Sequence, residues 1–97
     1  MRQYMIEFNL PRPITEEFMS LVPEQRACVS KLFHKGSLIS YTLDQNRTKL
    51  WVILMADDES ELLYLIDLFP MSDFMDYNYH ELMFHETVAM IPSMSLN

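Results

Sequence analysis

Five polar residues on two alternating stretches could carry out acid–base chemistry: Glu7 and Asn9 near the start of the chain, and Asp76, Asn78 and His80 near its end. A carboxylate can take a proton from carbon, and neighbouring donors can hold the oxygen on which negative charge develops. This chemistry requires no cofactor, and we predict none. We predict that Glu7 is the base, assisted by Asp76 and His80. Asn9 and Asn78 are predicted to bind the substrate.

The stretch that carries Glu7 has the period of a β-strand. Between residues 4 and 10, apolar side chains alternate with a second set that includes Glu7 and Asn9. If the apolar set packs against helices, the second set lies on the opposite face of a sheet. Burial on that face would raise the pKa of the Glu7 carboxyl, as a base requires.

The most apolar strand, residues 49–55, has no polar face. Trp51 and Ile53 point to one side, and Leu50 and Val52 point to the other. A strand that is apolar on both sides must be covered on both sides. We predict that Trp51 and Ile53 share the face of Glu7, where they bind the substrate or line an interface between two copies.

The order of the elements predicts one α+β domain over residues 1–97. We expect strands over residues 4–10, 37–43, 49–55 and 73–85, and helices over residues 14–35 and 58–69. Pro23 predicts a bend near Leu21 or a short turn before the main helix. The βαββαβ order predicts a ferredoxin-like fold, with an antiparallel sheet in strand order 4-1-3-2 and both helices on one face. The other face of the sheet is apolar and has no helix to cover it, so we predict that two copies pack face to face as a dimeric α/β barrel. We also predict that the tail over residues 86–97 forms a subunit contact.

Composition and charge exclude several classes of partner. The net charge of −7 argues against nucleic acid and against an anionic membrane surface, because both require clustered Lys and Arg. No apolar run approaches the length of a membrane-spanning helix, and the single cysteine, Cys28, favours a reducing compartment such as the cytoplasm. No metal is predicted, because no two of His34, His80 and His85 have the spacing of zinc ligands.

Several short motifs are similar to those of the muconolactone isomerase family. They are Ile6-Glu7-Phe8-Asn9-Leu10-Pro11, Lys35-Gly36, Asp58-Glu59-Ser60-Glu61-Leu62, Leu68-Phe69-Pro70 and Phe74-Met75-Asp76, followed by Leu82 and His85. The resemblance implies a homodimeric barrel, often built into larger rings, and isomerisation of a small lactone acid in aromatic-compound breakdown. The chain departs from the family in three places. Residues 37–43 lack its basic and histidine residues, the turn 44–47 lacks its glycine, and two residues are inserted after Pro70.

Three functional hypotheses stay open. The first is an isomerase or lyase of a small acidic or lactone molecule, with Glu7 as base. The second is a non-catalytic module of the same fold that binds a small molecule or forms oligomers, in which the polar residues are solvated or structural. The second is favoured because an acidic substrate needs a positive partner and none of the four arginines is predicted to point inward. The third, a haem-degrading monooxygenase, is weakened because no histidine is placed as an iron ligand.

Overall fold

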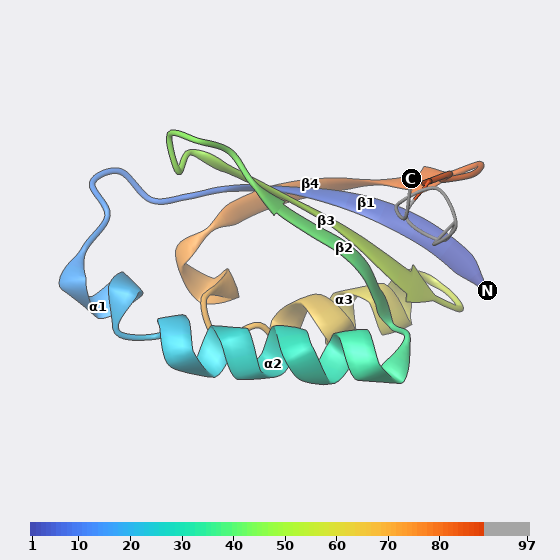
Figure 1. The fold of residues 1–97 in the computed structure, drawn as a ribbon, viewed down its shortest axis with the longest axis horizontal. Helices are drawn as coiled ribbons and strands as arrows, with labels where there is room; N and C mark the ends of the chain where they lie inside the picture. Colours follow the sequence, from blue (N-terminus) through green and yellow to red (C-terminus); the bar gives the residue numbers. More distant parts are fainter. Residues whose placement is uncertain (89–97) are drawn as a thin grey trace, which may run out of the picture.

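The computed structural model describes residues 1–88 as a four-stranded antiparallel sheet with every helix on one of its faces (Figure 1). The elements are β1 (Arg2–Asn9), α1 (Glu16–Met19), α2 (Val22–Lys35), β2 (Leu38–Leu43), β3 (Lys49–Ala56), α3 (Glu59–Asp67), the 3₁₀ helix η1 (Ser72–Phe74) and β4 (Asp76–Leu82). The α+β class is therefore confirmed, and the arrangement is compatible with a ferredoxin-like fold. The predicted tail contact over residues 86–97 falls mostly outside the described residues.

The central strands of the sheet are β3 and β1. The strand order is β2-β3-β1-β4, which reads 4-1-3-2 from the β4 edge. In this register Glu7 lies opposite Trp51 on one side and opposite Asn78 on the other. Residues far apart in the chain therefore meet across β1.

The core lies between the sheet and the helices. Alternate residues of β1 and β3 supply one side of it: Tyr4, Ile6, Phe8, Leu50, Val52 and Leu54. The helices supply the other side, chiefly Leu32, Leu62, Leu65 and Ile66. Because side chains alternate across a strand, Glu7 and its even-spaced neighbours face away from this core.

The predicted first helix is two helices. Thr15 accepts a hydrogen bond from the Phe18 N–H and caps α1, which ends at Met19. Then α2 begins at Val22 with Pro23 in its first turn. Backbone N–H groups in the first turn of a helix have no acceptor within the helix, so a proline there costs no hydrogen bond. The predicted bend near Leu21 is confirmed. The last strand is shorter than predicted, because residues 72–74 form a 3₁₀ turn before Asp76.

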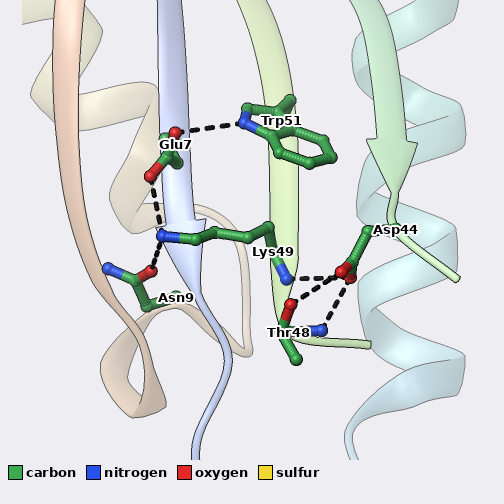
Figure 2. A network of polar contacts seen from close by, with 6 residues as sticks. All are labelled: Glu7, Asn9, Asp44, Thr48, Lys49 and Trp51. Carbon is green, nitrogen blue, oxygen red and sulfur yellow. Dashed lines mark hydrogen bonds and ion pairs between the residues drawn. The ribbon is translucent and has the colours of Figure 1, made fainter. Parts of the chain in front are cut away.

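A side chain, and not a glycine, holds the turn between β2 and β3. The Asp44 carboxylate accepts hydrogen bonds from the Thr48 N–H at 2.7 Å, the Thr48 hydroxyl at 2.6 Å and the Lys49 N–H at 2.9 Å (Figure 2). These bonds lower the pKa of Asp44. Arg47 takes a left-handed conformation, with φ of 58°, that glycine adopts more easily. The turn places Lys49 at the start of β3.

Candidate functional site

All seven residues predicted to act on a substrate lie on the open face, defined here as the sheet face opposite the helices. Three adjacent rows cross it from β4 through β1 to β3: Asp76–Asn9–Lys49, Asn78–Glu7–Trp51 and His80–Met5–Ile53. The prediction that Asp76, Asn78 and His80 share a face with Glu7 is confirmed by this register. The rows alone do not make a reactive site, because that depends on which side chains touch.

Glu7 is the centre of a hydrogen-bonded network on this face. Lys49 Nζ lies 2.9 Å from Glu7 Oε2 and donates to Asn9 Oδ1 at 2.6 Å (Figure 2). The Trp51 indole N–H donates to Glu7 Oε1 at 3.1 Å. Both carboxylate oxygens of Glu7 are therefore engaged, one with a cation and one with a neutral donor.

Lys49 is the residue that the sequence analysis missed. It stands two positions before Trp51, so the same alternation that put Trp51 on the open face also put Lys49 there. It is the only Lys or Arg among the described residues of the three rows. Its charge is matched by Glu7 and leaves no free cation in these rows for an acidic ligand.

The network corrects the predicted electrostatics of Glu7. Hydrogen bonds from Lys49 and then from Trp51 lower the pKa of Glu7 below its ordinary value, and the charge of His80 acts in the same direction. Burial works against them but is the smaller effect, since the Glu7 side chain is 35 % exposed. The expected rise of this pKa is wrong. Glu7 is a weak base because its ionised form is the stabilised one.

The residues of β4 stand apart from this network. Asp76, Asn78 and His80 are exposed, and Asp76 and Asn78 make no side-chain hydrogen bond to another residue within 1–88. Asn78 therefore has a free amide next to Glu7. On β3, Ile53 is only 2 % exposed, whereas Trp51 is half-buried.

Residues 1–88 contain no group of three His, Cys, Asp or Glu side chains that could hold a metal ion. No helix among them is long and apolar enough to cross a membrane. No family model and no curated protein matches the chain, so the resemblance to the muconolactone isomerase family stays a prediction.

Proposed function

We propose that the protein is a self-associating module in which the open faces of two copies pack together and enclose a small-molecule site. The observation that carries the proposal is large apolar surface on and beside the open face. Met5, in the centre of β1, is 36 % exposed. Directly after β4, Met83 is 95 % and Phe84 68 % exposed. Large apolar side chains exposed on one side of a molecule are typical of an interaction site.

The polar network on the open face favours a second copy as the partner. Glu7 and Lys49 neutralise each other, Trp51 donates to the second oxygen of Glu7, and Asn9 accepts a hydrogen bond from Lys49. Covering a paired and hydrogen-bonded charge costs much less than covering a lone one. The charges of this network therefore need no complementary charge from an identical sheet that packs against them.

The ligand of such a module would be small and uncharged. Between the two sheets, Trp51 offers a flat apolar ring and Asn78 an amide with no partner in the described residues. An acidic ligand would have to compete with Glu7 for Lys49. The geometry therefore supports binding of a neutral molecule better than binding of a lactone acid.

A pair of charge substitutions tests the interface. Met5→Glu adds a carboxylate at the centre of the open face, where association would bury it without a partner. We expect the dissociation constant of the two-copy form to rise about a hundredfold or more, measured by sedimentation velocity. Leu63→Glu is the matched control, because Leu63 is about equally exposed but lies on α3, on the other side of the molecule.

Circular dichroism would establish that both variants keep their fold. The same change in mass for Met5→Glu and Leu63→Glu would mean that net charge controls association. A two-copy mass for Met5→Glu equal to that of the unaltered protein would exclude the open face as the interface.

Lactone isomerisation is a second candidate, favoured by one observation. Glu7, Asn78 and His80 lie in adjacent rows, within reach of one small substrate. If Glu7 is the base, Glu7→Gln lowers kcat/KM on a lactone panel by about a hundredfold or more. Because the base must be ionised, kcat/KM would fall as the pH drops through a pKa below the ordinary 4.5. Equal turnover by Glu7→Gln, or a midpoint near neutral pH, would remove Glu7 from the reaction.

A further inference from the structure

A separate cleft lies on the helix-covered side of the sheet, away from the open face. Its volume is about 430 Å³, within the range of small-molecule sites. It opens between α1, the start of α2 and the hairpin that joins β2 to β3. The side chains that line it are mostly aliphatic, aromatic or methionine, including Phe18, Val22 and Leu50. Such a lining accommodates the apolar body of a ligand.

Two polar side chains in the cleft are held in a defined orientation. Gln25 is only 3 % exposed, and its Oε1 accepts a hydrogen bond from the Met71 N–H at 3.1 Å. This bond fixes the amide so that Nε2 points at Tyr41 and donates to its hydroxyl oxygen at 3.0 Å. The Tyr41 O–H proton has no acceptor among the described residues. It is therefore free to donate to a ligand.

The charge of the cleft is opposite to that of the chain. The chain has 14 acidic and 7 basic residues, yet the two charged residues that line the cleft are Arg26 and Arg47. Neither forms an ion pair with a carboxylate within residues 1–88. A guanidinium group binds a carboxylate through two parallel hydrogen bonds. Arg47 also keeps its left-handed backbone where glycine would be less strained.

We propose that this cleft binds a small organic carboxylate with an apolar body, such as a medium-chain or aromatic acid. Arg26 and Arg47 hold the carboxylate, the Tyr41 hydroxyl donates a further hydrogen bond, and the apolar lining covers the rest of the molecule. An inorganic anion would leave that apolar lining uncovered. The site shares no residue with the open face, so the proposed carboxylate binding and the proposed self-association can be tested separately.

Calorimetric titration of the full chain with octanoate and with octanol tests the proposal. The two probes share an apolar body and differ in charge, so we expect octanoate to bind at least about tenfold more tightly. The double variant Arg26→Gln/Arg47→Asn should lose this preference and keep its affinity for octanol. Asparagine is chosen at position 47 because it tolerates positive φ. The charge-matched control Lys31→Gln/Lys35→Gln alters lysines of α2 that line a different hollow, and it should bind octanoate like the unaltered protein.

The location of the site is tested with Ile14→Trp, which fills the cleft from an exposed position. We expect this variant to lose binding of both probes while its circular dichroism stays unchanged. Octanoate binding that survives in Ile14→Trp would overturn the proposal. So would equal affinity for octanoate and octanol, no octanoate binding at millimolar concentration, or loss of preference only in the lysine variant.

Discussion

Phe8→Ala is expected to lower the free energy of unfolding by about 3–5 kcal/mol, the range for an aromatic side chain removed from a packed core. Phe8 is fully buried on β1, which pairs on both sides. Its ring packs edge-on against Phe69, with ring centroids 6.2 Å apart, and against Tyr77 at 5.5 Å. Removing it opens a void between the sheet and the segment after α3, which neither side can close.

Urea unfolding followed by circular dichroism measures this loss. Tyr64→Ala is the control, because Tyr64 is another large aromatic residue but is exposed on α3, and its removal should cost less than about 1 kcal/mol. Both variants are compared at the same protein concentration, since the proposed association would add to the apparent stability. A loss for Phe8→Ala no greater than that for Tyr64→Ala would contradict the assigned core.

Gln25→Leu is expected to cost about 1–3 kcal/mol, although leucine is large enough to leave no cavity. Gln25 is the one polar side chain fully buried among the described residues, and it joins the Met71 N–H to the Tyr41 hydroxyl. Leucine would leave the Met71 N–H buried without an acceptor. The cost arises from that orphaned donor and not from a cavity.

The control for this substitution is Gln45→Leu, in the exposed turn between β2 and β3, where we expect a change within about 0.5 kcal/mol. Thermal unfolding of the two variants separates the effects. If Gln25→Leu is as stable as the unaltered protein, the amide does not hold α2 to the segment around Met71.

The fold could be predicted largely because its signals are local. The alternation around Glu7, the apolar strand over residues 49–55 and Pro23 in the first turn of α2 each act within a few residues of the chain. The order of these elements then leaves few ways to connect an antiparallel sheet. The start of the last strand could not be predicted as well, because the 3₁₀ turn before Asp76 is too short to show a periodic pattern of apolar residues.

The electrostatics of the candidate site could not be predicted in the same way. The pKa of Glu7 depends on donors from Lys49 and Trp51, which are more than 40 residues away and meet it only through the register of β1 with β3. Alternation places all three side chains on one face, but it does not show which of them touch. The cleft contains the buried Gln25, and the spacing of the apolar residues of α2 does not indicate that this polar side chain is buried.

The proposed function depends on a second copy that covers the open face. Sedimentation equilibrium of the unaltered protein, read together with the emission of its single tryptophan, detects that copy. We expect a mass twice the 11.6 kDa of the chain and a blue-shifted Trp51 emission that moves to the red on dilution. A single-copy mass at high micromolar concentration, with Trp51 emitting as a water-exposed indole, would contradict it.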